Sequence, residues 1–500
     1  MASSNEASTS NTQVAREMHA NQPVFLTTRT PYPLPSQKFV IPTSWKRFHL
    51  SQLVNKAVGL EKAVPFDFLI KGGLNAGATG EMLAPGMTLG DWCAANGVGE
   101  EETVEIEYVE SVMPPQKVGE IEADDWVSGV RNVDGYVMTA SYDGRLRLFD
   151  HSKNSVMDVP VHSAPITSVS LISSSTSSND EDKIYTVATS SHDLSACITQ
   201  LTIPSSPTSS KGKSSKILAS LHLHTQPISG VASNSSGTKL LTSSWDSLIG
   251  VWDTTIPSSD EVPLPDEESR DKKKRRKIEN ASATNGRGAE TKRKAPIGVL
   301  KSHVGRVSKA AFLSGGEGGE EGKAVSAGYD STVRIWDLEY GVCERTISAS
   351  EKPFLDLTPA QSGQTLLAAS TDRTVTQYDI RATSQTQSLQ ATVATFTHAS
   401  TPSCVCVPPS SFATSSPSST TTTVNSHQFI TGAYDGIVRV WDMRNPKGAM
   451  AAFKTGEGNA DSTNTGVKRT KKVLCVDWRK GLLTVGGEGG LEVWKVGEEA

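Results

Sequence analysis

Six aspartates of this chain stand in one recurring pattern, and a histidine precedes several of them. Each acid follows a short apolar segment, and in most copies an aromatic residue stands six positions after it. The acids are Asp143, Asp193, Asp246, Asp330, Asp372 and Asp435. The histidines are His162, His224, His303 and His398. A carboxylate beside an imidazole can act as an acid–base pair in catalysis, but one active site needs only one such pair, whereas this pattern recurs along the chain. Since a buried carboxylate is stable only when it is paired, the recurrence indicates a structural hydrogen-bond network.

Each copy of the pattern has the sequence of a β-hairpin. The segment before the acid is apolar and β-branched, as in 239–242, and the acid then stands in a tight turn. Two turns contain Asp-Gly, which tolerates the positive φ angles of a two-residue hairpin turn. After the turn the side chains alternate, as in 332–336, with the period of a β-strand. An internal repeat of this kind predicts a mainly β chain built from repeated sheets.

The copies count to seven, since a degraded one at 487–494 carries Glu488 in place of the aspartate. Successive acids are 42 to 84 residues apart, whereas a bare four-stranded blade needs about 40–45 residues. The repeat therefore predicts a seven-bladed propeller over 125–500, with the excess residues in loops. The histidine, the turn acid and the aromatic residue that follows it resemble the WD-repeat family, which implies a WD-repeat propeller. The last copy ends at Val496, after its third strand. We expect the segment 111–124, a linker and closing strand, to supply the fourth strand and protect the sheet edge.

The largest insert, 254–296, is predicted to be disordered, and it carries a cluster of basic residues. The cluster consists of Lys272, Lys273, Lys274, Arg275, Arg276 and Lys277. A second basic run follows at 292–294. Such clusters are typical of nuclear import signals or nucleic-acid contacts, and a solvated charge run without a role is the third reading. No aromatic residue interleaves the cluster, so base stacking is not supported.

Composition excludes several classes of protein. The net charge of −5 is not that of a polycation, and no apolar run is long enough for a membrane span. No signal-peptide pattern opens the chain, and residues 1–22 are polar and predicted to be disordered. The six cysteines lack metal-ligand spacing and fit a reducing compartment. We expect no cofactor, no intrinsic metal ion and no membrane association.

Residues 23–110 do not carry the repeat and form a separate small domain. The pattern predicts a hairpin, a helix and further strands. The predicted elements are strands Val24–Thr28 and Phe39–Pro42, helix Leu50–Val58 with Ser51 as a possible cap, and strands Phe66–Ile70 and Val104–Val109. This order resembles a ubiquitin-like β-grasp, an α+β fold.

The two domains together resemble one family, most specifically at Val64–Ile70 and Asp125–Ser128. It is the family of the WD-repeat ribosome-biogenesis factor that joins pescadillo and the block-of-proliferation protein in a trimeric nucleolar complex. The resemblance implies a non-catalytic assembly factor of the large ribosomal subunit, needed for pre-rRNA maturation. It implies that the propeller binds a block-of-proliferation-type WD protein, with pescadillo in the same complex. It also implies residence in the nucleus, in both nucleolus and nucleoplasm.

In that family the ubiquitin-like domain binds midasin, the AAA ATPase that removes the complex from pre-ribosomal particles. The midasin site holds a divalent cation with one open position, which takes a carboxylate from the incoming ligand. The family's acid lies just before the last strand of the domain, and the matching loop here is 97–102. By register Glu101 is the match, with Glu100 and Glu102 as alternatives. The plain reading is that all three are a solvated turn.

Two other readings stay open beside this one. A notchless-type midasin ligand has the same two domains, but eight blades are expected of it against the seven counted here. A substrate receptor of a cullin ubiquitin ligase is suggested by the W-D-x-R pattern at 441–444 and its variant at 378–381. An enzyme is the least favoured class, since no phosphate loop and no nucleophile constellation is found.

Overall fold

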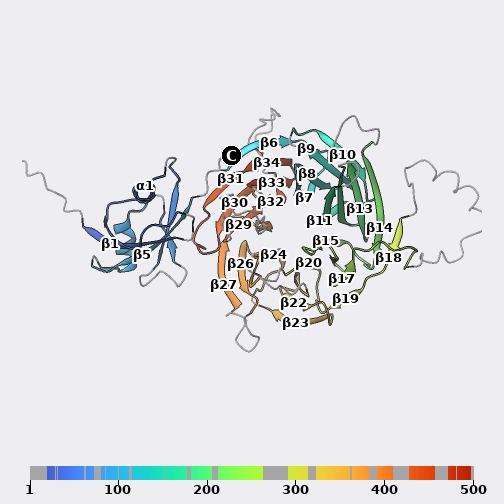
Figure 1. The fold of residues 1–500 in the computed structure, drawn as a ribbon. Helices are drawn as coiled ribbons and strands as arrows, with labels where there is room; N and C mark the ends of the chain where they lie inside the picture. Colours follow the sequence, from blue (N-terminus) through green and yellow to red (C-terminus); the bar gives the residue numbers. More distant parts are fainter. Residues whose placement is uncertain are drawn as a thin grey trace, which may run out of the picture. The chain divides into compact units, whose positions relative to one another are not determined.

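The computed structural model divides into two compact units, Met1–Ser111 and Val112–Ala500, each considered by itself (Figure 1). The residues that it describes are 20–28, 30, 32–60, 63–71, 80–84, 86–99, 101–111, 115–150, 152–176, 182–204, 212–262, 291–313, 322–348, 350–360, 363–381, 391–408, 427–456, 471–479 and 481–496.

The described residues of the N-terminal unit form one five-stranded sheet and two helices. The strands are β1 (Asn21–Thr28), β2 (Lys38–Pro42), β3 (Phe66–Lys71), β4 (Glu81–Met82) and β5 (Val104–Glu110). The helices are α1 (Arg47–Val58) and α2 (Leu89–Asn96). The sheet order is β2-β1-β5-β3-β4, and β1 runs parallel to β5 while the other pairs are antiparallel. Alternate residues of β1, β3 and β5 point into a core closed by Leu50 and Trp92 from the helices. This parallel central pair flanked by hairpins is the arrangement expected of a β-grasp.

Several sequence expectations in this unit need correction. Strand β1 begins at Asn21, and Gln22 is buried, so the predicted disordered segment 1–22 extends too far. Helix α1 begins at Arg47, and Ser51 lies inside it rather than at its cap. The Ser51 hydroxyl instead accepts from the backbone N–H of Phe66 at 3.0 Å, which joins the helix to β3. Helix α2 was missed because eight residues are too few to show a helical period.

The described residues of the second unit form seven four-stranded sheets, one of them extended by a fifth strand (Figure 1). The first three sheets contain β7 (Val127–Val133), β8 (Tyr136–Ser141), β9 (Arg145–Asp150) and β10 (Ser155–Pro160); β11 (Ile166–Thr176), β12 (Lys183–Ser191), β13 (Ser195–Ile203) and β14 (Ser214–His222); and β15 (Ile228–Ser233), β16 (Lys239–Ser244), β17 (Leu248–Asp253) and β19 (Gly298–Lys301). The next two contain β20 (Val307–Phe312), β21 (Lys323–Gly328), β22 (Val333–Asp337) and β23 (Val342–Ile347); and β24 (Phe354–Pro359), β25 (Thr365–Ser370), β26 (Thr374–Asp379) and β27 (Thr392–Thr397). The last two contain β28 (Pro402–Cys406), β29 (Gln428–Ala433), β30 (Ile437–Asp442) and β31 (Ala451–Lys454); and β32 (Val473–Arg479), β33 (Leu482–Gly487), β34 (Gly490–Lys495) and β6 (Gln116–Ile121).

The sheets close a ring around a central channel. The first strand of each sheet contacts the first strand of the next, and β32 of the seventh sheet contacts β7 of the first. The seventh sheet takes its outer strand from before the first blade, because β6 pairs antiparallel with β34. Lys117 of β6 also pairs with Glu492 of β34 at 2.9 Å. The pairing of β6 with β34 links the beginning of the propeller to its last blade and covers the free edge of β34. Strand β6 lies in the segment 111–124, where the closing strand was expected.

The insert predicted to be disordered over 254–296 is ordered at both of its ends. Strand β18 (Lys292–Lys294) pairs parallel with β14 and adds a fifth strand to the second sheet. The Asp260 carboxylate accepts from the backbone N–H of Arg293 at 2.8 Å, and the buried Lys294 ammonium pairs with Asp253. The prediction was wrong here because strand pairing supplies partners for the backbone that composition does not reveal. The cluster from Lys272 to Lys277 lies outside the described residues.

Candidate functional site

Three of the histidine–aspartate pairs meet in the structure as parts of one repeated network. The imidazole Nδ1 lies 2.9 Å from the carboxylate in the pair His162–Asp193, 3.0 Å in His224–Asp246 and 2.8 Å in His303–Asp330. Each Nε2 lies 2.7–2.9 Å from a buried hydroxyl, which belongs to Thr189, Thr242 and Ser326 respectively. In the third and fourth sheets the indoles of Trp252 and Trp336 donate to that same hydroxyl.

The electrostatics of these pairs favour a fixed structural role. Burial works against a charge on His162, but its hydrogen bond to Asp193 and its contact with Cys197 outweigh that and raise its pKa to about 9. Burial likewise works against the Asp193 carboxylate, but the bonds from His162 and Ser195 lower its pKa to about 2. Both partners are therefore charged near neutral pH, with every polar atom of the imidazole engaged. A base for catalysis needs a pKa near the working pH and access to a substrate, and this buried ion pair has neither.

Other blades depart from the pattern. His398 does not meet Asp435: its Nδ1 lies 3.2 Å from the carbonyl of Phe396, and its Nε2 lies 2.9 Å from Thr431. Arg439 holds the Asp435 carboxylate at 2.8 Å instead. In the first blade Arg147 holds Asp143 in the same way at 2.6 Å. An arginine four positions after the acid accompanies this substitution, but Arg334 stands at the same spacing from Asp330, which still pairs with His303, so the spacing alone does not predict it.

His398 makes the stability of the propeller sensitive to acid. Burial lowers its pKa to about 4, against about 6.5 in an unfolded chain. Below pH 6.5 the imidazole of His398 is protonated in the unfolded chain but stays neutral in the folded one. The free energy of unfolding that is present above pH 6.5 is therefore lost as the pH falls. We expect His398 to contribute about 1 kcal/mol per pH unit on average between pH 6.5 and 5, because the unfolded imidazole is only half protonated at pH 6.5. Denaturant unfolding at several pH values measures this slope. His398→Gln should flatten this slope.

His162→Gln is the matched control for that experiment. The pKa of His162 is raised to about 9, so its contribution is complete below pH 6.5 and is lost only as pH rises through 9. This control should leave the slope between pH 6.5 and 5 as it is in the parent chain. An unchanged slope in His398→Gln would contradict the assignment.

The loop that carries Glu101 in the N-terminal unit is held from both sides. Helix α2 ends at Gly97, which adopts a left-handed φ of 70°, and Val98 bonds back to the carbonyl of Cys93 at 2.9 Å. The backbone N–H of Glu102 then closes a turn onto Gly99 at 3.1 Å. The structure places Glu101 within this turn with its side chain exposed. Glu102 is also exposed, and Glu100 lies outside the described residues.

Gln22 anchors the loop and was missed in the sequence. Its side-chain amide is buried and donates to the carbonyls of Gly99, at 3.1 Å, and Glu102. Lys38 of β2 also donates to the hydroxyl of Thr103 at 3.2 Å. No local signal marks Gln22, because it reaches the loop only through the parallel pairing of β1 and β5. The result is an exposed carboxylate in a turn whose described neighbours Gly99, Glu102 and Thr103 are held by hydrogen bonds, a geometry suited to ligating a cation held by another molecule.

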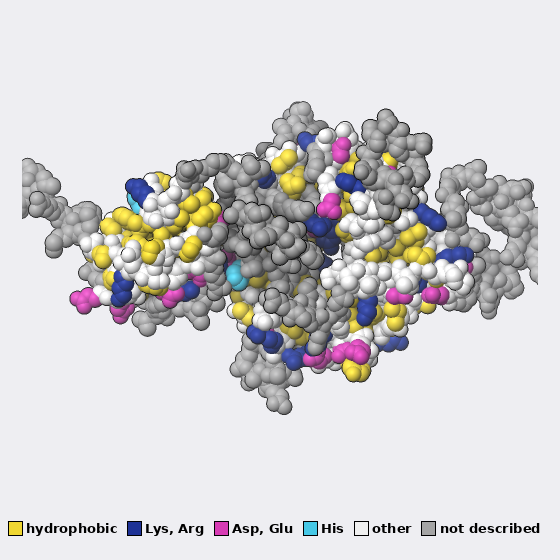
Figure 2. Space-filling view, viewed as in Figure 1, with side chains coloured by type: hydrophobic (Ala, Val, Ile, Leu, Met, Phe, Trp, Pro, Cys, Tyr) yellow, Lys and Arg dark blue, Asp and Glu magenta, His cyan; other side chains and the backbone are white. Residues whose placement is uncertain are grey.

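The same unit exposes large apolar side chains. Val40 on β2 is 70% exposed and Phe48 on α1 is 66% exposed. Figure 2 shows hydrophobic side chains gathered on the viewed face of this unit and acidic ones along its lower edge.

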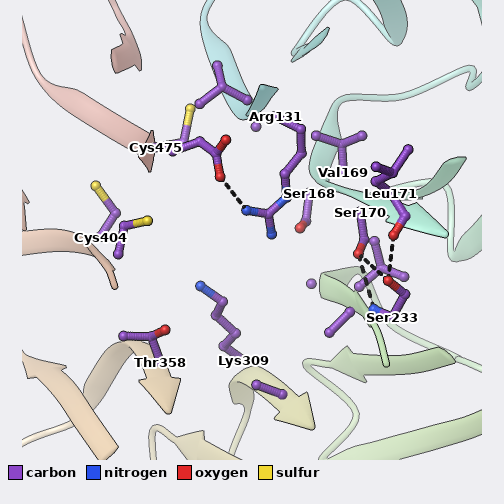
Figure 3. Close-up of a pocket in the computed structure, with 18 of the residues that line it drawn as sticks. Arg131, Ser168, Val169, Ser170, Leu171, Ser233, Lys309, Thr358, Cys404 and Cys475 are labelled. Atoms are coloured by element: carbon purple, nitrogen blue, oxygen red, sulfur yellow. Dashed lines mark hydrogen bonds and ion pairs between the residues drawn. The ribbon is translucent and has the colours of Figure 1, made fainter. Parts of the chain in front are cut away.

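The central channel of the propeller is a cavity of about 800 Å³. Its lining is rich in hydroxyl groups, and Arg131 and Lys309 point toward its middle (Figure 3). Arg131 of β7 pairs with Asp477 of β32 at 2.9 Å, and Lys309 pairs with Asp356 at 2.6 Å. These ion pairs join neighbouring blades, because β7 and β32 belong to the first and seventh sheets and β20 and β24 belong to the fourth and fifth. Asp477 of β32 also accepts from the backbone N–H of Asn132.

The described residues contain no cluster of three or more potential metal ligands. They also contain no helix whose length and apolar character would suffice to cross a membrane.

Comparison with known proteins agrees with this architecture. Residues 23–76 match the model of the NLE (NUC135) domain, and residues 215–253, 294–337 and 390–442 match the WD domain, G-beta repeat. The predicted mainly β fold, with WD repeats behind a separate N-terminal domain, is thereby confirmed. The described residues form seven sheets in the second unit, not the eight expected of a notchless-type protein.

Curated relatives align with this chain over nearly its whole length. A protein of Coprinopsis cinerea named ribosome biogenesis protein YTM1 is 53% identical over 96% of this chain and 96% of its own. The protein of the same name in Saccharomyces cerevisiae is 27% identical over 91% of this chain and 92% of its own. The ribosome biogenesis protein WDR12 homolog of Ixodes scapularis is 27% identical, over 93% and 96%. The predicted resemblance to a WD-repeat ribosome-biogenesis factor is therefore confirmed, and this chain belongs to the YTM1/WDR12 family of ribosome biogenesis proteins.

Proposed function

We propose that the chain is a non-catalytic assembly factor of the large ribosomal subunit with two separate binding tasks. The propeller anchors it, through a block-of-proliferation-type WD protein and together with pescadillo, to pre-ribosomal particles whose pre-rRNA is maturing. The N-terminal unit recruits the midasin ATPase, which releases the complex. Family membership supports the setting, and the division into two compact units supports the separation of the tasks.

The observation that carries the proposal is the presentation of Glu101. The charge of an exposed glutamate adds little to the stability of the fold. The turn that carries Glu101 is nevertheless held by the buried side chain of Gln22 and by the left-handed C-cap of α2. A rigid backbone lowers the entropy lost when the carboxylate is fixed on a metal ion. The ion belongs to midasin, and the chain supplies one oxygen ligand to it.

The propeller suits the anchoring task because closed sheets give a stiff body with several loop-bearing surfaces. Ion pairs inside the channel join the first blade to the seventh and the fourth blade to the fifth. Pulling on the N-terminal unit would then load the partner interface rather than unfold one blade.

The proposed function includes residence in the nucleolus and nucleoplasm. The run from Lys272 to Lys277 is the proposed import signal. Fluorescence microscopy of a tagged chain with these six residues replaced by alanine tests it, and undiminished nuclear signal would refute it.

Affinity purification of the tagged full chain tests the proposal as a whole. Pescadillo, the block-of-proliferation-type protein and precursor RNA of the large subunit are expected to co-purify. A complex assembled from purified components without midasin should stay intact when ATP is added, because the energy for release comes from the ATPase. Co-purification of a cullin adaptor instead of pescadillo would favour the ubiquitin-ligase alternative, and release by ATP alone would contradict the two-task scheme.

A further inference from the structure

One face of the propeller carries seven equivalent turns that the function described so far does not use. In six blades the residue before the turn acid, and in the seventh blade Glu488 itself, donates its backbone N–H to the residue that precedes the innermost strand. The seven bonds, of 2.7–3.1 Å, are Tyr142 to Trp126, His192 to Pro165, Trp245 to Pro227, Tyr329 to Arg306, Thr371 to Pro353, Tyr434 to Thr401 and Glu488 to Lys472. This shared bond places the seven pairs round one mouth of the channel, where the innermost strands begin. We call these fourteen residues the turn ring.

The turn ring is rich in aromatic side chains and poor in charge. Its aromatic members are Trp126, Tyr142, His192, Trp245, Tyr329 and Tyr434. Its charged members are Arg306, Lys472 and Glu488 alone, and the last two pair with each other at 3.1 Å. This composition matches the centre of a protein–protein interface, where tyrosine, tryptophan and arginine are enriched and other charges are depleted.

The aromatic side chains are not needed to hold the blades together. Tyr329 is 45% exposed, Trp126 is 43% exposed and Tyr434 is 38% exposed. In the second, third and fourth blades the buried network runs through the acid, the histidine and the hydroxyl. In the first and sixth blades an arginine holds the acid. In all five the side chain before the acid lies outside these contacts. A polar residue would serve this turn position equally well, so repeated exposed aromatic rings at one mouth indicate a surface that is covered in the assembled state.

Neighbouring members of the ring are already arranged against one another. The rings of Trp126 and Tyr142 lie 5.7 Å apart, and those of His192 and Trp245 lie 5.4 Å apart. The guanidinium of Arg306 stacks over Trp245 at 4.4 Å. Such contacts restrict the rotamers of the side chains before binding, which reduces the entropy lost at an interface.

Charges around the turn ring distinguish between classes of partner. Exposed charges in the turns and adjoining loops include Asp124, Asp143, Glu351 and Asp372 on the acidic side and Lys352, Arg373 and Lys471 on the basic side. With Arg306 added, four cations face four acids. Nucleic acid needs a groove of net positive charge along its backbone, and this mixed rim does not supply one. A protein surface with its own mixed charges does fit it.

We propose that the turn ring is the face on which the propeller docks its protein partner. The occupant is a folded protein surface with apolar side chains over the channel mouth and a mixed-charge rim around them. This inference rests on the proposed anchoring function and names the face that performs it. The aromatic members of the ring are the energetically dominant contacts, because truncation of such residues accounts for most binding energy at interfaces.

A matched pair of double variants tests the proposal. Tyr329→Ala/Tyr434→Ala removes two exposed rings of the turn ring. Tyr340→Ala/Val393→Ala removes side chains that are 75% and 49% exposed outside the ring. Tyr340 is the closest control for Tyr329, because it lies in the turn after β22, at the opposite end of the same sheet from the turn before β22.

Binding of each full-length chain to the purified block-of-proliferation-type protein is measured by titration. The turn-ring variant should bind at least about 30-fold more weakly, corresponding to two interface anchors, and the control variant within about 2-fold of the parent. Both variants should keep the unfolding midpoint of the parent, since the substituted side chains are exposed.

Each result that would contradict the proposal points to a different error. Parent-like binding by the turn-ring variant overturns this inference and leaves the anchoring function standing. Absence of binding by the parent chain overturns the anchoring function, and with it the inference. Loss of crosslinked precursor RNA with unchanged protein binding would assign the face to RNA and overturn the proposal of a protein occupant.

Discussion

A chain carrying Glu101→Ala is expected to lose binding to midasin while it keeps its fold and its propeller partner. The exposed carboxylate is the proposed ligand of a divalent cation held by midasin, and alanine supplies no oxygen for it. Loss of an outer-shell partner costs metal sites about 10–100-fold in affinity, so loss of a direct ligand should cost at least about 100-fold. A magnesium-dependent pull-down measures this, with chelator added to a parallel sample.

The controls for this prediction come from the same unit. Glu105→Ala removes an exposed acid of β5 that pairs with Lys71 at 3.4 Å, and it should leave midasin binding unchanged. Glu101→Gln keeps the shape of the side chain and removes its charge, so it should behave like alanine. Retained binding by Glu101→Ala, with loss in Glu102→Ala or Glu100→Ala, would move the ligand to the neighbouring position. Retained binding in all three would remove the loop from the mechanism.

Asp330→Ala is expected to destabilise the propeller by about 3 kcal/mol, because it leaves the buried imidazole of His303 without its carboxylate. Burial works against the Asp330 charge, but the bond from His303 outweighs this and holds the pKa of Asp330 well below its usual range. The carboxylate also accepts from the backbone N–H groups of Val304 and Thr332 and from the Thr332 hydroxyl, so the variant loses four hydrogen bonds at once. The neighbouring Trp336 indole shares the buried hydroxyl of Ser326 and should loosen with it.

Asp372→Ala is the matched control, because it removes the acid from the equivalent turn of the next blade. That carboxylate is exposed and bonds only within its own turn, to Thr374. Its loss should cost under about 1 kcal/mol. Denaturant unfolding followed by tryptophan fluorescence reports on the propeller, which holds all of the tryptophans except Trp45 and Trp92. Equal losses in the two variants would show that the histidine network adds nothing to stability.

Local patterns in the sequence were sufficient for most of the architecture. The alternation of apolar residues and the acid in each turn predicted the hairpins, and counting the copies predicted seven blades. These features depend on residues within a few positions of one another, so they can be read without knowledge of the fold. The position of Glu101 in a loop before the last strand of the N-terminal unit belongs to the same class.

The sequence was less informative about which side chains and which strands pair with one another. His398 and Asp435 carry the same residue types as the other pairs, yet Arg439 takes the carboxylate and the imidazole turns to a backbone carbonyl. The insert returns as β18 to the second sheet although it leaves from the third. Both outcomes depend on which groups meet across the fold, and residue type alone does not distinguish the competitors.

The sequence by itself determined the number of blades, the class of both units and the structural role of the repeated acids. The tertiary structure decided that buried Gln22 holds the loop of Glu101, and that fourteen residues scattered over more than three hundred positions form one ring. Hydrophobic period and turn chemistry are local properties that short peptides already express. Contacts between distant residues depend on the closure of the ring and the register of each sheet, and these exist only once the whole chain has packed.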